Sequence, residues 1–260
     1  MTQDLQPRLA LPATGVVITG GASGLGLASA RALAAVGRPV ALWDLHEDKA
    51  AAAAQAVSAE SGTLCVGYGV DVRDPAAITQ AAERTRAALP SIGGLVHCAG
   101  IVDIASLDGI TLQSWDDGIN IHLRPIILLL QAFLEDMKRT PGAAMVATAS
   151  INATLGNAMN PIYTAAKGGV LSLVRSLADR LGRDGIRINS ISPGQIMTPM
   201  MKPSVDALPD RYFENRILLD RIGEPEEIGR VVRFLLSDEA SYITAAEIVV
   251  DGGNISSQRQ

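Results

Sequence analysis

The chain has few of the residues on which several kinds of site depend. It contains only two cysteines and three histidines among 260 residues. Two thiols give no disulfide framework, so a reducing compartment fits best. The histidines, His46, His97 and His122, are scattered along the chain rather than spaced as zinc ligands. We therefore expect neither a disulfide-stabilised fold nor a metal site.

Positive charge and long apolar runs are also scarce. The chain carries 22 Lys and Arg against 27 Asp and Glu, a net charge of −5, and no basic cluster, which argues against a nucleic-acid partner. The longest apolar stretch, residues 125–130, is far too short to cross a bilayer. The first fifteen residues lack the pattern of a secretory signal. We expect a cytoplasmic protein with neither a nucleic-acid nor a membrane partner.

What the sequence does contain is a regular alternation of two patterns. Hydrophobic residues make up 48% of the chain and charged residues 19%, a composition that suits a sheet buried on both faces. Short β-branched runs alternate with alanine- and leucine-rich segments, which predicts a doubly wound parallel sheet flanked by helices in a single α/β domain over residues 1–260. The seven expected strands read GVVIT, PVALW, TLCVGYGV, GLVHC, AAMVATAS, IRINSIS and EIVV.

Prolines mark several expected helix starts. Pro75, Pro161 and Pro225 each follow Asp, Asn or Glu, and a proline is well tolerated where a first-turn N–H has no partner. A long helix is predicted over residues 115–137. Residues 197–221, irregular and containing several Met and Pro, are predicted to form a lid or binding loop.

A glycine-rich segment, TGGASGLG, joins the first expected strand to the first helix. Gly20, Gly24 and Gly26 would allow a tight turn, close approach of the backbone to a pyrophosphate, and close packing of the helix on the sheet. The helix N-terminus would add free N–H groups and a partial positive charge. Alone this is weak evidence for a dinucleotide site, because any strand-to-helix connection can use glycine.

Two acids at strand ends strengthen the dinucleotide hypothesis. Asp44 stands eighteen residues after Gly26, close to the spacing at which a carboxylate meets the ribose diol. It would accept hydrogen bonds from both hydroxyls and repel a 2′-phosphate, which predicts NAD rather than NADP. The alternative role for Asp44 is to cap the following helix. By the same geometry, Asp71 would line the adenine pocket.

The segment PIYTAAK places Tyr163 and Lys167 on one helical face. A neighbouring ammonium lowers the pKa of a phenol, so the pair is a candidate proton-transfer device. The competing interpretation is a surface pair, because this spacing often occurs by chance. Ser150, at the end of AAMVATAS, would reach the same substrate oxygen as Tyr163. Asn120 offers an amide to a water that feeds protons to Lys167.

With these residues assembled, the sequence resembles the short-chain dehydrogenase/reductase family over nearly its whole length. TGGASGLG is similar to the cofactor turn of the family, and Cys98-Ala99-Gly100 to its Asn-Ala-Gly segment. Further similarities are found in Asp71-Val72 (adenine contact), Pro193-Gly194 with Ile196 and Thr198 (nicotinamide-side loop), Arg221-x-Gly223-x-Pro225-Glu226-Glu227 and Val250-Asp251-Gly252-Gly253 (C-terminal motifs), and Asn120, Ser150, Tyr163 and Lys167 (catalytic tetrad).

The resemblance implies a Rossmann-like fold, an NAD cofactor and a homotetramer. It implies that Tyr163 is the general acid/base, that Lys167 lowers its pKa and binds the nicotinamide ribose, that Ser150 orients the substrate oxygen, and that Asn120 supports a water relay. The cofactor contacts expected from the motifs are Gly20, Ser23, Gly24, Leu25, Gly26, Asp44, Asp71, Val72, Cys98, Ala99, Gly100, Tyr163, Lys167, Pro193, Gly194, Ile196 and Thr198.

Two positions depart from the family pattern. Cys98 stands where the family has asparagine, so the hydrogen bonds of that amide must be replaced or the site altered. Cys98 itself reads as a small buried hydrophobe, with a redox role as the alternative. Ala245 replaces a glycine, which we interpret as a local packing change.

The expected activity is hydride transfer between NAD and a secondary alcohol or ketone. A methionine-rich, weakly charged substrate wall favours an apolar cyclic or steroid-like small molecule, although core packing is an equal alternative for each methionine. The alternatives to this function are a 3-oxoacyl thioester reductase and a catalytically silent NAD-binding regulator. The residues expected to form the substrate wall are Ile151, Asn152, Met159, Met197, Met200 and Met201.

Overall fold

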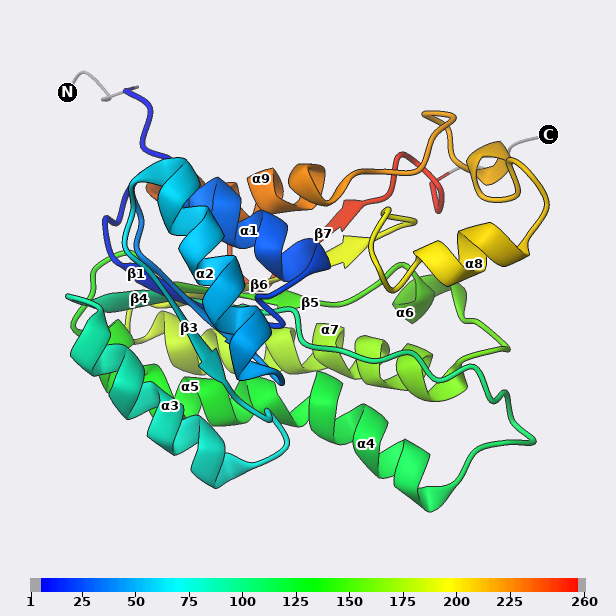
Figure 1. The fold of residues 1–260 in the computed structure, drawn as a ribbon, viewed down its shortest axis with the longest axis horizontal. Coiled ribbons are helices and arrows are strands. Elements are labelled where there is room, and N and C mark those ends of the chain that lie inside the picture. The colour runs from blue at the N-terminus through cyan, green and yellow to red at the C-terminus, as the bar shows by residue number, and fades with distance from the viewer. Residues whose placement is uncertain (1–5, 257–260) are drawn as a thin grey trace.

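A computed structural model describes residues 6–256. Its seven strands form one parallel sheet in the order β3-β2-β1-β4-β5-β6-β7, which confirms the expected architecture (Figure 1). Because the order reverses between β1 and β4, a crevice is expected at the carboxyl ends of these two strands. The strands are β1 Gly15–Thr19, β2 Val40–Asp44, β3 Cys65–Gly69, β4 Ile92–His97, β5 Ala144–Thr148, β6 Arg187–Pro193 and β7 Glu247–Val250.

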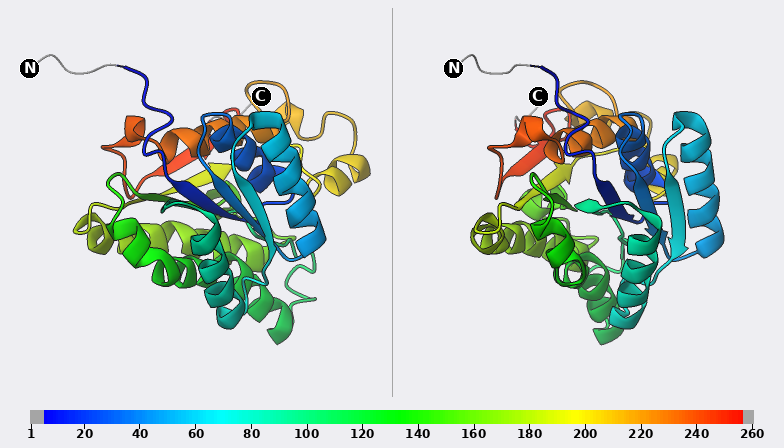
Figure 2. Two further views of the ribbon diagram at one scale, coloured as in Figure 1. Left: turned by 60° about the vertical axis from the view of Figure 1, so that its left-hand side comes forward. Right: turned by 90° about the vertical axis from the view of Figure 1, so that its left-hand side faces the viewer.

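Helices cover both faces of the sheet, as Figures 1 and 2 show. One layer contains α1 (Gly24–Ala34), α2 (Glu47–Ser61) and α9 (Pro225–Leu235), with α9 packed along α1. The opposite layer contains α3 (Pro75–Ala88), α4 (Leu112–His122), α5 (Arg124–Lys138) and α7 (Pro161–Gly182). The shorter elements are α6 (Asn152–Leu155), α8 (Lys202–Ala207) and the 3-10 turns η1 (Glu214–Arg216) and η2 (Asp238–Ala240).

The helix starts marked by proline are confirmed. Helices α3, α7 and α9 begin at Pro75, Pro161 and Pro225. The carboxylate of Asp74 accepts a hydrogen bond from the backbone N–H of Ala76, and thereby satisfies one of the free donors in the first turn of α3.

The predicted long helix over residues 115–137 is wrong, because the chain forms two helices that meet at Leu123. Pro125 lies in the first turn of α5. It has no N–H to donate to the carbonyl of Ile121, four residues earlier, and its ring would clash with that carbonyl in a continuous helix. The break between the two helices, at Leu123, therefore falls three residues after Asn120.

Hydrophobic side chains fill the space on both sides of the sheet. Trp43 and Phe133 belong to the cluster on the α5 side, and their ring centroids lie 5.8 Å apart. Leu33 and Ile228 belong to the cluster under α1 and α9. Burial on both faces explains why the central strands β1 and β5 are nearly continuous apolar runs rather than alternating ones.

Two buried guanidinium groups hold the C-terminal end of α9. Arg38 donates to the carbonyl oxygen of Leu236 at 2.8 Å, and Arg187 donates to those of Leu235 at 2.8 Å and Ser237 at 3.0 Å. Burial lowers the pKa of Arg38 to about 10, so it remains charged at neutral pH. These bonds satisfy carbonyl groups that a helix end leaves without partners.

Candidate active site

The glycine turn is shaped by backbone contacts that leave no room for side chains. Gly20 and Gly24 have φ angles of +65° and +48°, a region that favours glycine. A Cβ on Gly26 would lie 2.1 Å from the carbonyl oxygen of Gly20, and one on Gly20 would lie 2.8 Å from the backbone nitrogen of Ala99. The turn thus packs directly against the segment that follows β4. Ser23 is the N-cap residue of α1, and Leu25 lies in its first turn.

Asp44 forms a hydrogen bond with the glycine turn. Its carboxylate accepts a hydrogen bond of 3.0 Å from the backbone N–H of Ala22. The N-cap residue of α2 is His46. The capping alternative for Asp44 is therefore wrong, and the half-buried carboxylate lies beside the turn.

Asp71 lies just beyond β3 and is held by an arginine. Arg73 donates to both carboxylate oxygens of Asp71, and this hydrogen bonding lowers the pKa of the acid. The same guanidinium bonds Asp117 on α4 at 3.0 Å. Asp71 is thus linked to the helix that carries Asn120, and its neighbour Val72 is buried.

The segment after β6 folds back towards the glycine turn. Gly194 donates its N–H to the carbonyl of Val250 at the end of β7. A Cβ on Gly24 would lie 3.4 Å from the methyl group of Thr198, so the two segments are in contact. Pro193 and Ile196 are both buried between these points.

The expected catalytic pair lies on one face of α7. The Nζ atom of Lys167 is 5.4 Å from the ring centroid of Tyr163, and the Ser150 hydroxyl is near enough to the Tyr163 phenol to influence its pKa. Lys167 is only 3% exposed and donates to the carbonyl oxygen of Thr148 at 2.6 Å. The surface-pair alternative is therefore wrong.

The expected lowering of the Tyr163 pKa is not what the structure gives. Burial raises the pKa of Tyr163, and only the hydrogen bond with Ser150 acts in the opposite direction. Burial also lowers the pKa of Lys167, to about 8. Desolvation of the phenolate outweighs the attraction of an ammonium that is engaged with the Thr148 carbonyl.

Asn120 lies on α4, which packs closely on α7. A Cβ on Gly118 would lie 2.4 Å from the Cγ2 atom of Ile162, the residue before Tyr163. Any side chain at position 118 would push the two helices apart. Asn120 follows two residues later in the last turn of α4 and is half-buried.

Two buried histidines at the site were not expected from the sequence. His97, the last residue of β4, lies 2.8 Å from the hydroxyl of Thr19 and 3.0 Å from the carbonyl oxygen of Ile121. His122 packs edge-on against the Tyr163 ring, with centroids 5.2 Å apart. The only available signal was positional, since one histidine precedes Cys98 and the other follows Asn120 by two residues.

Cys98 is partly buried between these groups. Its Sγ atom lies 3.3 Å from the hydroxyl of Thr148, and burial raises the pKa of the thiol. A raised pKa keeps the sulfur protonated and unreactive, which favours the packing role over a redox role. Ala99 donates its N–H to the Thr19 hydroxyl at 3.3 Å. A Cβ on Gly100 would collide with the ring of His122.

The residues expected to form the substrate wall differ in burial. Ile151 is buried and donates its N–H to the carbonyl of Pro193. Asn152 begins α6, and its backbone N–H donates to the Ser150 hydroxyl. Met159 is 56% exposed, Met197 and Met200 are also exposed, and Met201 is half-buried. Core packing is thus the wrong alternative for the three exposed methionines. The stretch 197–221 is not wholly irregular, because it contains α8 and η1.

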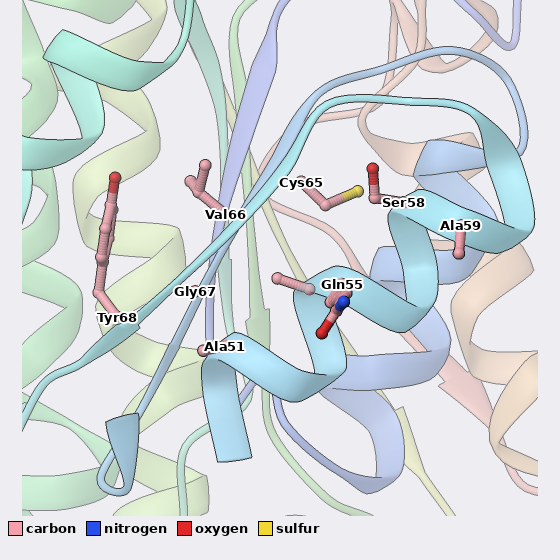
Figure 3. A pocket seen from close by; sticks show the side chains of 9 residues that line it. Ala51, Gln55, Ser58, Ala59, Cys65, Val66, Gly67 and Tyr68 are labelled. Atoms are coloured by element: carbon pink, nitrogen blue, oxygen red, sulfur yellow. The ribbon is translucent and has the colours of Figure 1, made fainter. Parts of the chain in front are cut away.

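A groove of about 630 Å³ lies elsewhere, between α2 and the edge strand β3 (Figure 3). Cys65 points toward α2 in this view, and burial raises the pKa of its thiol to about 11. None of the expected site residues lines this groove.

Comparison with known proteins decides the family. A family model described as enoyl-(acyl carrier protein) reductase matches residues 20–254. The chain is 34% identical to 3-alpha-(or 20-beta)-hydroxysteroid dehydrogenase of Mycobacterium tuberculosis, over 92% of this chain and 88% of that protein. The chain belongs to the short-chain dehydrogenase/reductase family.

Other short-chain dehydrogenases/reductases are similar to this chain in sequence and in fold. Levodione reductase of Leifsonia aquatica is 38% identical over 92% of each chain. The structure of L-sorbose reductase from Gluconobacter frateurii, complexed with NADPH and L-sorbose, superposes with a TM-score of 0.87 at 27% identity, covering 94% of this chain and 97% of that one.

Family membership makes the protein an oxidoreductase that uses a nicotinamide cofactor and acts at CH–OH groups. Among residues 6–256, none of the helices has both the length and the apolar character needed to cross a membrane.

Proposed function

We propose that the protein is an NAD-dependent oxidoreductase that moves a hydride between nicotinamide and a secondary alcohol or ketone, with Tyr163 exchanging the proton. The observation that carries this proposal is the half-buried phenol of Tyr163, whose pKa the Ser150 hydroxyl lowers and whose ring is flanked by Lys167 on the same helical face. Nicotinamide supplies the hydride chemistry when bound, and the residues of this chain orient the reactants and handle the proton.

The glycine turn fits a dinucleotide. Without side chains, Gly20 and Gly26 let the turn pack against its own backbone and against the segment after β4. A compact turn of this kind at the N-terminus of α1 suits a pyrophosphate. Lys167 would bind the nicotinamide ribose. The cofactor contacts that we propose remain those given by the family motifs.

Asp44 supports the choice of NAD. Its carboxylate is fixed beside the turn by the Ala22 N–H, where it would accept ribose hydroxyls and repel a 2′-phosphate. The relative L-sorbose reductase is complexed with NADPH, so cofactor choice varies among similar structures.

The raised pKa of Tyr163 suits proton donation. A phenol that stays protonated at neutral pH is the form that gives its proton to a carbonyl oxygen, while the Ser150 hydroxyl stabilises the developing negative charge on that oxygen. In the opposite direction the same phenol oxygen would accept the proton. Asn120 would then hold the water of a proton relay that includes Lys167.

An apolar cyclic or steroid-like substrate is supported by the exposed methionines. Met159, Met197 and Met200 are accessible for contact with a ligand, and methionine adapts well to apolar shapes. The names of two relatives refer to a hydroxysteroid and to levodione. We propose residues 197–221 as the substrate loop of a single domain, and a cytoplasmic homotetramer as the assembly.

The alternative functions have weaker support. A 3-oxoacyl thioester reductase would need cations for a carrier phosphate, and Lys202, the one lysine of the substrate loop, is paired with Asp206 at 3.0 Å. A catalytically silent NAD-binding regulator would have no need for Ser150, Tyr163 and Lys167 to be grouped together.

The decisive experiment measures turnover of cyclic and steroid alcohols and ketones with NAD(H) and NADP(H), using the full-length chain and its Tyr163→Phe variant. We expect turnover with NAD(H), and a fall of about 10²- to 10⁴-fold in kcat for Tyr163→Phe with unchanged NADH affinity. Equal kcat in the two proteins would contradict the proton role, and NADH binding without turnover would favour the silent regulator.

A further inference from the structure

The end of α4 carries a carbonyl that the helix itself cannot satisfy. Pro125 leaves the Ile121 carbonyl oxygen without the N–H that a continuous helix would offer. The Nε2 atom of His97 lies 3.0 Å from this oxygen. Because a carbonyl only accepts, Nε2 carries the hydrogen and Nδ1 accepts from the Thr19 hydroxyl, 2.8 Å away. Both ring nitrogens of His97 are thus satisfied by groups from two different elements, β1 and α4.

His122, the next residue after Ile121, bonds back to the segment that follows β4. Its Nε2 atom lies 2.8 Å from the carbonyl oxygen of Ile101 and 3.2 Å from the backbone nitrogen of the same residue. Either neutral tautomer of the imidazole therefore finds a partner at Nε2. The two histidines form reciprocal links, one from β4 to the end of α4 and one from the end of α4 to the chain beyond β4.

The ring of His122 is fitted closely between its neighbours. A Cβ on Gly100 would lie 2.6 Å from the Cε1 atom of this ring and 3.0 Å from its Nδ1 atom. His122 is 1% exposed, and its plane stands at 89° to that of Tyr163. Gly100 thus provides the room in which the imidazole contacts the phenol ring that Lys167 also flanks.

Burial, assisted by the nearby charge of Lys167, keeps both histidines neutral. Burial is the main reason that the pKa of His97 falls to about 3 and that of His122 to about 2, and the ammonium of Lys167 lowers both further. The other titratable groups around the pair are Cys98 and Tyr163, and burial raises the pKa of each. Two neutral imidazoles can hold this geometry without adding positive charge beside Lys167.

We propose that His97 and His122 are positioning residues of the active site, where His97 fixes the end of α4 behind Asn120 and His122 fixes the ring of Tyr163. This inference rests on the proposed function, because the effect of positioning is measured through turnover.

Two substitutions distinguish the contribution of the His122 ring from the contribution of its hydrogen bonds. His122→Phe keeps a flat ring against Tyr163 but cannot bond Ile101, whereas His122→Gln keeps an amide donor and acceptor but removes the ring. We expect kcat to fall about 10- to 100-fold in His122→Gln, with KM for NAD within about twofold of the original, and to recover to within about threefold in His122→Phe. For His97→Phe, which removes both of its links, we expect a similar fall in kcat.

Met137→Ala is the control for loss of stability alone. Met137 is fully buried in the last turn of α5 and is not part of the site, so its truncation lowers Tm without altering kcat. The primary deuterium isotope effect on kcat adds a second readout. It should rise in His122→Gln, because slowed chemistry becomes rate-limiting, and stay constant in Met137→Ala.

The outcomes distinguish the two proposals. An original protein that binds NADH but turns over no alcohol or ketone overturns the proposed function. If the original protein is active while His122→Gln and His97→Phe both keep kcat within twofold, the positioning role is wrong. If His97→Phe does not fold, the His122→Gln and His122→Phe pair decides, and equal loss of kcat in these two variants overturns the role of the ring.

Discussion

The two sides of the candidate site are built in different ways. On the cofactor side, positions without side chains bring backbone segments together, as at Gly26 and Gly20. On the side assigned to substrate, apolar side chains face outward, including Met159 at 56% exposed and Met200 at 47%. The contrast teaches that the first side is specified by backbone geometry, which tolerates little change, whereas the second is specified by exposed side chains that can change without altering the fold.

The sharpest test of this contrast is Gly26→Ala. The new Cβ would meet the backbone of Gly20, which cannot rotate away, so the turn must shift. Overpacking of this kind costs about 1–3 kcal/mol, and we expect a similar cost in NADH affinity, about 10- to 100-fold. Equilibrium unfolding in urea and NADH fluorescence titration measure the two effects.

Gly182→Ala is the matched control for Gly26→Ala. Gly182 is the last residue of α7, and beyond its chain neighbours and the adjacent helical backbone no atom lies within 4 Å of the position that its Cβ would take. Alanine is favoured over glycine in helices by up to about 1 kcal/mol, so this variant should be equally or more stable and bind NADH unchanged. Unaltered NADH affinity in Gly26→Ala would show that the turn is less constrained than its contacts indicate.

A smaller effect on the free energy of unfolding is expected from pH, and it depends on His97 and His122. His97 and His122 have pKa values lowered by burial from 6.5 to about 3 and about 2, so below pH 6.5 the unfolded chain binds protons that the folded chain does not. Their contribution to stability is present above pH 6.5 and is lost as the pH falls towards these values. Each histidine should reduce the free energy of unfolding by about 1.4 kcal/mol per pH unit in this range.

Urea unfolding of the original protein and of His122→Gln between pH 6 and pH 5 measures this dependence. The variant should show a slope lower by up to about 1.4 kcal/mol per pH unit, because one of the two groups has been removed. This interval lies above the range in which most carboxylates titrate. Parallel slopes would mean that His122 binds its proton at the same pH in the folded and unfolded chains.

The smallest change in stability is expected on the substrate side. In Met200→Ser, an exposed apolar side chain is replaced, and the free energy of unfolding should change by no more than about 0.5 kcal/mol. KM for an apolar substrate should nevertheless rise. Tyr242→Ser, at a fully exposed residue outside the site, is the control that should alter neither quantity. A large loss of stability in Met200→Ser would remove the contrast between the two sides.

Much of the fold followed from local sequence patterns. The strands GVVIT and EIVV have the bounds that were expected, and three helices begin at the marked prolines. Such features depend on residues close together in the chain. The break behind Asn120 was missed although its local cause, Pro125, was visible, because the continuous apolar pattern on both sides of it was given more weight.

The site was predictable as a set of residues but not in its electrostatics. Tyr163, Lys167 and Ser150 were expected to converge, and the structure brings them together. The direction of the Tyr163 pKa was wrong because it depends on burial by segments distant in sequence. The roles of His97 and His122 were missed for the same reason, since their partners lie up to 78 residues away.

The two guanidinium groups at the end of α9 have a consequence for how ligands arrive. Separating α9 from the sheet would remove the carbonyl acceptors of Leu235, Leu236 and Ser237 from the buried cations of Arg38 and Arg187, which costs several kcal/mol. These hydrogen bonds hold α9 against the sheet at the edge where β2 and β6 begin, so that edge stays closed. The cofactor and substrate that we propose would therefore enter at the opposite edge of the sheet, where β1 and β4 end.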